Sequence, residues 1–222
     1  MNFSRYAIYY IPDLHLFQIG SDWLGWNSIS GQETTLSFDH RRITDRPRKY
    51  GFHGTVKPPF SLASRSTQGE LQDAFHAFCA TISPAKGGAL KISRLGRFLA
   101  MTQDVQSNEV TKLAASTVSY FDKFRAPLSD TDIEKRRRNR LTPQQDALML
   151  RWGYPYVMQE FKFHMTLTGP LAPNEIDAVE QRANTRFLEF IGQPLNMASL
   201  ALLGEDRDSG RFHVIERLSL RR

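Results

Sequence analysis

A His-x-Thr triplet occurs twice in this chain, and each copy begins the same order of predicted elements. The first lies in YGFHGTVKPPF, residues 50–60, and the second in FKFHMTLTGPL, residues 161–171. Each is followed by a helical pattern and then by two short strands at similar spacing. A repeated order of elements indicates a duplicated unit. We therefore predict one domain of two related lobes, about 46–105 and 161–222, with a helical and basic insert at about 106–160.

Local patterns within these lobes predict the individual strands and helices. RYAIYYI, residues 5–11, is aromatic and β-branched, which predicts a buried strand. Thr67 and Glu70 have capping-box spacing at the start of a helix. The arginine-rich stretch before the first triplet is expected to be a loop, and Pro58 and Pro59 are expected to end the triplet strand. Further helices are predicted over 14–25, 67–83, 110–124, 143–152 and 173–191, and further strands over 89–95, 98–103, 195–203 and 211–220.

Positive charge is concentrated in two segments of a chain whose net charge is +6. Residues 41–57 carry six basic side chains against Asp45, and residues 134–140, EKRRRNR, carry five against Glu134. The remainder is net negative, so the positive potential is local, and it would attract phosphate-bearing ligands. For residues 134–140 a solvated surface run is the alternative.

Composition and spacing exclude several other classes. Cys79 is the one cysteine, so no internal disulfide can form and a cytoplasmic location is expected. No apolar run approaches the roughly 20 residues that span a bilayer, so no membrane partner is expected. The histidines lack zinc-ligand spacing and no glycine-rich phosphate loop is present, so we predict no metal and no cofactor.

The alternation of side chains along a strand gives each triplet strand two different faces. One face is apolar and can be covered by a helix. The other presents imidazole, hydroxyl and ammonium groups, and two related lobes could bring these polar faces together across a cleft. The polar faces are formed by His53, Thr55 and Lys57 in the first motif, and by Lys162, His164 and Thr166 in the second.

Such a cleft suits phosphodiester cleavage by paired acid–base catalysis. A neutral histidine accepts a proton from the attacking water or hydroxyl, and a protonated one donates to the departing oxygen. The ordinary histidine pKa of about 6.5 lets both forms coexist near neutral pH. Thr55 and Thr166 are expected to bind non-bridging phosphate oxygens, and lysine charge would offset the charge that develops in the transition state.

The strings HGTV and HMTL resemble the paired signatures of the two-histidine (2H) phosphoesterase superfamily, which includes 2′-5′ RNA ligase-like proteins and cyclic nucleotide phosphodiesterases. RYAIYYIP and RWGYPYVMQEFKFHMTLTGPL resemble a bacterial branch associated with phosphonate utilisation operons. The resemblance implies a bilobal, pseudo-two-fold α+β fold, with antiparallel sheets, helices outside and a cleft between the lobes. It implies metal-independent catalysis by His53 and His164, with Thr55 and Thr166 as phosphate contacts.

Other residues are candidates for substrate binding, and a second function class stays open. Tyr154 and Tyr156 could stack on a base or sugar, and Arg48 could line the mouth of the cleft. The partner expected is a small phosphorylated substrate, such as a nucleotide or a sugar cyclic phosphate, and RNA is a further possibility. The alternative is an RNA- or nucleotide-binding module that keeps the fold without catalysis. The sequence leaves open which histidine is the acid and what the oligomeric state is.

Overall fold

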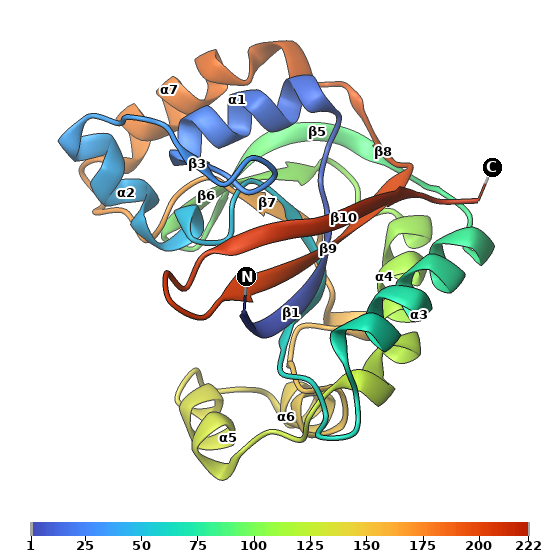
Figure 1. Ribbon diagram of the computed structural model, residues 1–222. Coiled ribbons are helices and arrows are strands. Elements are labelled where there is room, and N and C mark those ends of the chain that lie inside the picture. Colours follow the sequence, from blue (N-terminus) through green and yellow to red (C-terminus); the bar gives the residue numbers. More distant parts are fainter. Residues whose placement is uncertain (1, 222) are drawn as a thin grey trace.

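One large antiparallel sheet runs through the structure, a computed structural model that describes residues 2–221. Its eight strands lie in the order β10-β9-β1-β4-β7-β6-β5-β8 (Figure 1). The predicted α+β class and the antiparallel pairing are confirmed. The strands of this sheet are β1 (Phe3–Tyr10), β4 (Gly54–Phe60), β5 (Ala85–Leu95), β6 (Phe98–Gln103), β7 (His164–Thr166), β8 (Pro194–Met197), β9 (Ser199–Asp206) and β10 (Phe212–Ser219), and β2 (Trp26–Asn27) and β3 (Gln32–Glu33) form a separate small ladder.

The two motif strands, β4 and β7, are neighbours at the centre of this sheet. The strands that follow the first motif, β5 and β6, lie on the β7 side. The strands β9 and β10, which follow the second motif, lie on the β4 side. The expected pair of separate sheets is therefore replaced by one sheet, in which the two halves of the chain have exchanged strands.

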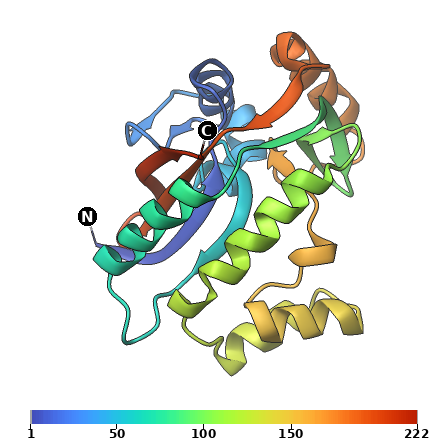
Figure 2. The same ribbon diagram turned by 90° about the vertical axis from the view of Figure 1, so that its right-hand side faces the viewer.

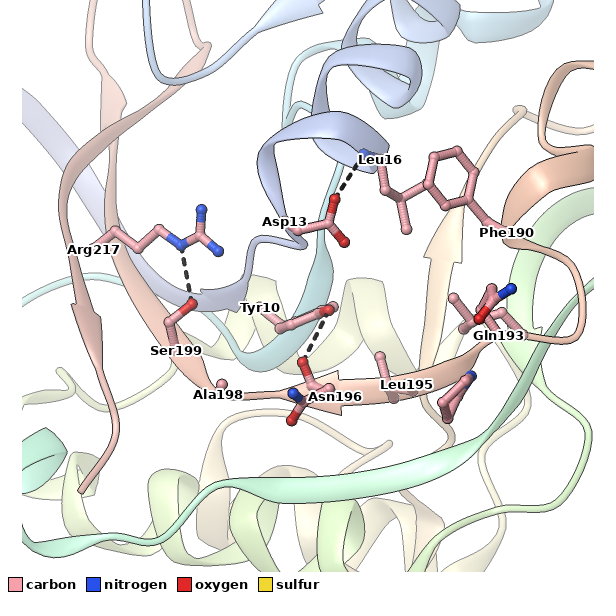
Figure 3. Close-up of a pocket in the computed structure, with 12 residues that line it drawn as sticks. Tyr10, Asp13, Leu16, Phe190, Gln193, Leu195, Asn196, Ala198, Ser199 and Arg217 are labelled. Atoms are coloured by element: carbon pink, nitrogen blue, oxygen red, sulfur yellow. Dashed lines mark hydrogen bonds between the residues drawn. The ribbon is translucent and has the colours of Figure 1, made fainter. Parts of the chain in front are cut away.

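The sheet curls because a single residue, Ala198, connects β8 at one edge of the sheet with β9 in its other half. β8 is an edge strand paired with β5, whereas β9 pairs with β1 and β10. One residue spans at most about 3.6 Å, so the β8 edge must approach β9. Figure 3 shows this corner, where the Tyr10 hydroxyl donates to the Asn196 carbonyl at 3.3 Å beside a cavity of about 220 Å³. The single strand predicted over 195–203 is wrong, because the break at Ala198 gives two strands with different partners.

The sequence signals for the ends of two helices are confirmed. The capping box of Thr67 and Glu70 opens α3 as predicted, and Gly25 ends α1 with φ 80°. No helix within residues 2–221 combines the length and apolar character needed to cross a membrane. The helices are α1 (Leu14–Leu24), α2 (Phe38–Arg48), α3 (Gln68–Thr81), α4 (Asn108–Tyr120), α5 (Asp130–Arg137), α6 (Pro143–Trp152) and α7 (Ile176–Arg186), with short 3-10 turns η1 (Asp122–Phe124), η2 (Met158–Glu160) and η3 (Leu188–Phe190).

Two local predictions around the first motif are wrong. The arginine-rich stretch expected to be a loop contains α2, which begins after an N-cap at Ser37 and includes Pro47. β4 continues through Pro58 and Pro59 to Phe60. Here β4 has two residues where β1 has one, and such a bulge leaves proline, which has no N–H, outside the regular ladder.

The main core lies on one face of the sheet, under the helices. In Figures 1 and 2, α3 and α4 run side by side against the strands, while α1, α2 and α7 gather at the other end. Alternate strand residues point into this core, and the polar residues of both motifs therefore emerge on the opposite face. The core includes Ile8, Val56, Met101 and Met165 from the strands and Trp23, Phe75, Val110 and Phe187 from the helical segments.

Replacement of Gly54 tests how closely the two motifs fit. A Cβ at Gly54 would lie 2.5 Å from the ring of Phe163, which precedes the second histidine. Gly54→Ala is expected to lower the free energy of unfolding by about 1–3 kcal/mol in urea titrations, as overpacking does. The control is Gly69→Ala in α3, where the added Cβ meets nothing within 4 Å, and it should leave stability unchanged or raise it by up to about 1 kcal/mol. Equal stabilities of the two variants would contradict this fit.

Candidate active site

The two motifs meet because Gly54 of β4 pairs with Met165 of β7. This pair lies on the core face, so the residues on either side of it emerge on the other face. Residues that face each other directly have Cβ atoms about 4.5–5.5 Å apart, and diagonal neighbours are about 7–8 Å apart. The two imidazoles are diagonal neighbours on one face. Extending the observed register by one residue in each direction sets His53 opposite Thr166 and Thr55 opposite His164.

Both imidazoles are held by the same contact, a backbone carbonyl two residues earlier. Nδ1 of His53 lies 2.9 Å from the Gly51 oxygen, and Nδ1 of His164 lies 2.8 Å from the Lys162 oxygen. A carbonyl can only accept, so Nδ1 carries the proton in each ring. Nε2 is therefore the atom of each histidine that can exchange a proton with a ligand.

His53 is set in an environment that keeps it neutral. Its ring stacks on Tyr9, with centroids 3.7 Å apart and planes inclined by 18°. Nε2 lies 3.0 Å from Oγ1 of Thr55, whose hydroxyl donates to it. Burial lowers the pKa of His53 to about 4, against the opposing effect of the Gly51 carbonyl, and the charge of His164 lowers it further. His53 is thus neutral at neutral pH.

His164 lies on the side of His53 that faces away from Tyr9, next to the small polar side chains of β5 and β6. It faces Thr102 of β6 in the ladder. The Thr102 and Ser93 hydroxyls are 2.7 Å apart, and the Phe98 ring lies 6.2 Å from the imidazole. His164 is half-buried, and so it stays more accessible to solvent than the core residues around it.

Lys57 is not part of this polar face. Its side chain is 1% exposed, and Nζ donates to the Val118 carbonyl at 3.2 Å and lies 3.8 Å from Asp122. Burial lowers its pKa to about 8. The register of β1 with β4 shifts between the partners of Thr55 and Lys57, so the strict alternation that predicted a shared face with His53 fails. The ammonium group instead binds near the end of α4, where positive charge is favourable.

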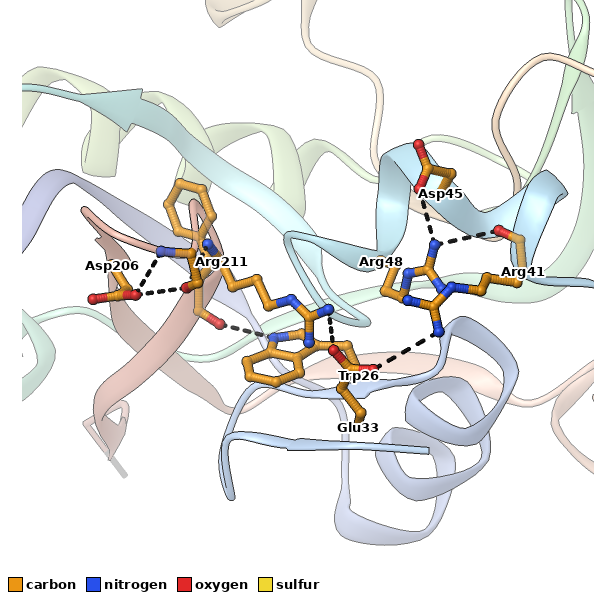
Figure 4. Close-up of polar contacts among 9 residues, drawn as sticks. Trp26, Glu33, Arg41, Asp45, Arg48, Asp206 and Arg211 are labelled. Atoms are coloured by element: carbon orange, nitrogen blue, oxygen red, sulfur yellow. Dashed lines mark hydrogen bonds and ion pairs between the residues drawn. The ribbon is translucent and has the colours of Figure 1, made fainter. Parts of the chain in front are cut away.

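Arg48 is likewise held away from the histidines. It is 5% exposed and donates to the Arg41 carbonyl at 3.3 Å and to Asp45 at 2.9 Å, as Figure 4 shows. These contacts within α2 account for the burial of the Arg48 side chain. The predicted ligand contact of Arg48 next to the histidines is therefore not supported. The cavity of about 360 Å³ on which it borders is also lined by Lys49, Glu205 and Arg211.

The other predicted binding residues fall at the edge of the site. The Lys162 side chain is exposed, and its carbonyl holds His164. Tyr154 packs edge-on against Tyr156 at 5.6 Å, and Tyr156 is 42% exposed. Burial raises the pKa of Tyr154, which Arg136 lowers, while Tyr156 and Tyr50 raise it further. The Tyr50 ring, whose charge also acts on Tyr154, lies 6.2 Å from that of His53.

Tyr9 is the main site residue that sequence reasoning missed. It lies within the strand predicted over 5–11, and the apolar character of that strand concealed a side chain on the face of the motifs. Its place in the site follows from its pairing with Thr55 across the β1–β4 ladder, which no local sequence pattern shows. It could be recognised only once the partner of β4 was known.

The arrangement can move protons at one bound group. Two Nε2 atoms share one face with the hydroxyls of Thr55 and Thr166, and hydroxyls can bind the oxygens of a phosphate. Within the described residues no group of three or more His, Cys, Asp or Glu side chains is placed to hold a metal ion.

The pKa of His53 gives a prediction independent of any substrate. Between pH 6.5 and about 4 the unfolded chain takes up a proton that folded His53 does not, so this group should reduce stability as the pH falls through that window. NMR titration of the imidazole, assigned by its loss in His53→Asn, should show a midpoint well below 6.5. A midpoint at or above 6.5 would contradict the proposed environment.

Comparison with known proteins relates the chain to curated sequences. It is 33% identical over 228 residues to "Ribose 1,5-bisphosphate phosphokinase PhnN" of Janthinobacterium sp. (strain Marseille), with 97% of this chain and 50% of that protein covered. It is 30% identical over 220 residues to the protein of the same name in Laribacter hongkongensis (strain HLHK9), with 95% and 50% covered. The chain spans about half the length of these relatives.

Similarity to solved structures is weaker. The chain resembles one described as "Crystal structure of phosphoesterase", with 11% identity and a TM-score of 0.48, and E. coli LigT complexed with phosphate, with 9% identity and a TM-score of 0.46. Both alignments cover 100% of both chains. Residues 55–213 match the family described as "Protein of unknown function (DUF1045)". This match covers most of the chain, which therefore belongs to the DUF1045 family.

Proposed function

We propose that this chain is a metal-independent phosphoesterase that hydrolyses a small cyclic phosphate, with His53 as general base and His164 as general acid. The observation that carries the proposal is the position of both imidazoles on one face of adjacent strands, with Nδ1 of each occupied by a carbonyl. A module that only binds phosphate does not need two proton-transfer groups in matched tautomers, and so this arrangement favours the enzyme.

In the proposed step, Nε2 of His53 accepts a proton from water as the water oxygen attacks phosphorus. A P–O bond of the cyclic diester breaks, and protonated His164 donates its Nε2 proton to the departing oxygen. The product is a phosphate monoester with one free hydroxyl. Return of a proton from His53 to His164 through solvent restores both groups, so that one water is consumed. Thr55 and Thr166 bind the non-bridging oxygens.

A phosphoribosyl cyclic phosphate is the first substrate to test. The relatives are named for a kinase that acts on ribose 1,5-bisphosphate. If water opens the 1,2-cyclic phosphate of ribose 5-phosphate and O2 departs, the phosphate stays on O1 and ribose 1,5-bisphosphate results. Such an activity would supply the compound in the relatives' name, and it agrees with the resemblance to a phosphonate-utilisation branch.

The kinase activity itself is not proposed for this chain. The sequence contains no GxxxxGK[ST] phosphate loop, and the chain covers only half of each relative. We infer that the kinase named there depends on the other half of those proteins.

Removal of either imidazole tests the catalytic pair. His53→Ala and His164→Ala should each lower kcat/KM by roughly 10²–10⁴ on a cyclic phosphate that the wild type cleaves, and the double variant should be little worse than the poorer single one. Thr55→Ala and Thr166→Ala should cost less. The substrates are 2′,3′-cyclic nucleotides and ribose cyclic phosphates. A folded single-histidine variant with near-full turnover would contradict the assignment and favour the binding module.

The pH profile and a chelator test the same mechanism from another side. The profile of kcat/KM should be bell-shaped, and its acid limb, set by His53 in the free enzyme, should lie well below pH 6.5 because burial lowers that pKa to about 4. Turnover should persist in EDTA. Loss of turnover on chelation that zinc restores would rule out the metal-independent mechanism.

A further inference from the structure

The arginines of the basic insert are not equivalent in the fold. In Figure 1, α5 and α6 lie together at the lower end of the molecule. Arg137 of α5 is exposed and makes two contacts of 2.8 Å to the Asp146 carboxylate of α6. Its neighbour Arg136 is half-buried, and its guanidinium lies 5.3 Å from the centroid of the Tyr154 ring. Within residues 2–221, Arg136 has no carboxylate at ion-pair distance.

Lys49 repeats this arrangement next to the first motif. Its ammonium lies 4.7 Å from the centroid of the Tyr50 ring, and in the described part of the chain it forms no ion pair. The charge of Lys49 contributes to lowering the pKa of Glu205, but the Glu205 carboxylate is hydrogen-bonded to Arg5. Two cations that lack carboxylate partners are therefore held on aromatic rings, where cation–π attraction replaces an ion pair.

The aromatic rings under these cations converge on one place. The Tyr9 and Tyr50 rings lie 3.7 and 6.2 Å from the His53 imidazole, so Lys49 on Tyr50 is next to the site. Burial raises the pKa of Tyr9 well above its usual value, and the charges of Tyr50, Arg5, Tyr154 and Glu205 also act on it, which adds Tyr154 and its Arg136 to the same neighbourhood. Tyr9 itself stacks on His53. Because β1 lies on the side of β4 away from β7, this cluster flanks His53 on the side opposite His164.

The Tyr9 hydroxyl is a hydrogen-bond donor that no described residue uses. Tyr9 is 1% exposed, yet its hydroxyl forms no hydrogen bond with any described residue, unlike the hydroxyls of Tyr6 and Tyr10. The hydroxyl is therefore free to donate to a ligand, and a phosphate oxygen is a strong acceptor for it. Phosphate would also neutralise the two unpaired cations.

We propose that this cluster is a second anion subsite, which binds a phosphate that is not cleaved. The inference rests on the proposed function for the phosphate between the histidines, and it narrows the substrate to a small molecule with two phosphate groups. The residues of the subsite are Arg136, Lys49, Tyr9, Tyr50 and Tyr154.

Arg136→Gln and Arg137→Gln are a matched pair for the test, because they remove the same charge from adjacent positions of one helix. The probes are adenosine 3′,5′-bisphosphate and adenosine 3′-monophosphate, titrated calorimetrically at about 20 mM ionic strength, where screening is weak. Wild type should bind the bisphosphate about 10-fold more tightly, the worth of one good charge-assisted contact. Arg136→Gln should lose most of this preference, and Arg137→Gln should keep it.

Two results would overturn the subsite. One is full preference in an Arg136→Gln protein that melts like wild type. The other is an equal loss in Arg137→Gln, because diffuse charge on α5 would then explain the binding.

Hydrolysis of adenosine 2′,3′-cyclic phosphate, with and without a 5′-phosphate, separates this inference from the proposed function. A protein without turnover on any cyclic phosphate, but with a bisphosphate preference that depends on Arg136, would retain the subsite and lose the phosphoesterase. A protein that cleaves both forms with equal KM, in wild type and in Arg136→Gln, would retain the phosphoesterase and lose the subsite.

Discussion

The antiparallel pairing of β4 with β7 is the contact on which the candidate site depends. Only Gly54 and Met165 form the register between these strands, yet that single pair determines which side chains share a face. Gly54 is needed here because the ring of Phe163 occupies the space that a Cβ would fill. A slip of one residue would send one motif into the core and the other to the open face.

The remainder of the sheet supports this short pairing by exchange of strands. β7 has three residues and pairs with β6 on its other edge, so strands from the first half of the chain hold the second motif. β4 is held by β1, which in turn pairs with β9 from the second half. Neither motif therefore keeps its position without the other half of the chain, and unfolding of either half is expected to remove both histidines from the site.

Two nearly identical motifs acquire different chemistry from their surroundings. Each histidine donates Nδ1–H to the carbonyl two residues earlier, so the same local hydrogen bond occurs in both motifs. Only His53 has a tyrosine ring stacked on it, and burial lowers its pKa to about 4. The tyrosines around His53 also carry Lys49 and Arg136. The same cluster that buries His53 therefore carries the positive charge of the proposed second subsite.

The sequence by itself determined the features that depend on neighbours along the chain. Alternation predicted the polar face of each motif, helical spacing and a capping box predicted α3, and Gly25 predicted the end of α1. These signals are short-range, because turn, cap and strand geometry are set within a few residues.

Tertiary structure decided the features that depend on which segments meet. The shift in β1–β4 register turned Lys57 under α4, the break at Ala198 sent β8 and β9 to different partners, and packing made α2 a helix despite Pro47. It also gave two adjacent arginines of one charged run different surroundings. Arg136 lies over the Tyr154 ring, whereas Arg137 is paired with Asp146. No local pattern encodes these outcomes, because each depends on a residue far away in sequence that folding brings into contact.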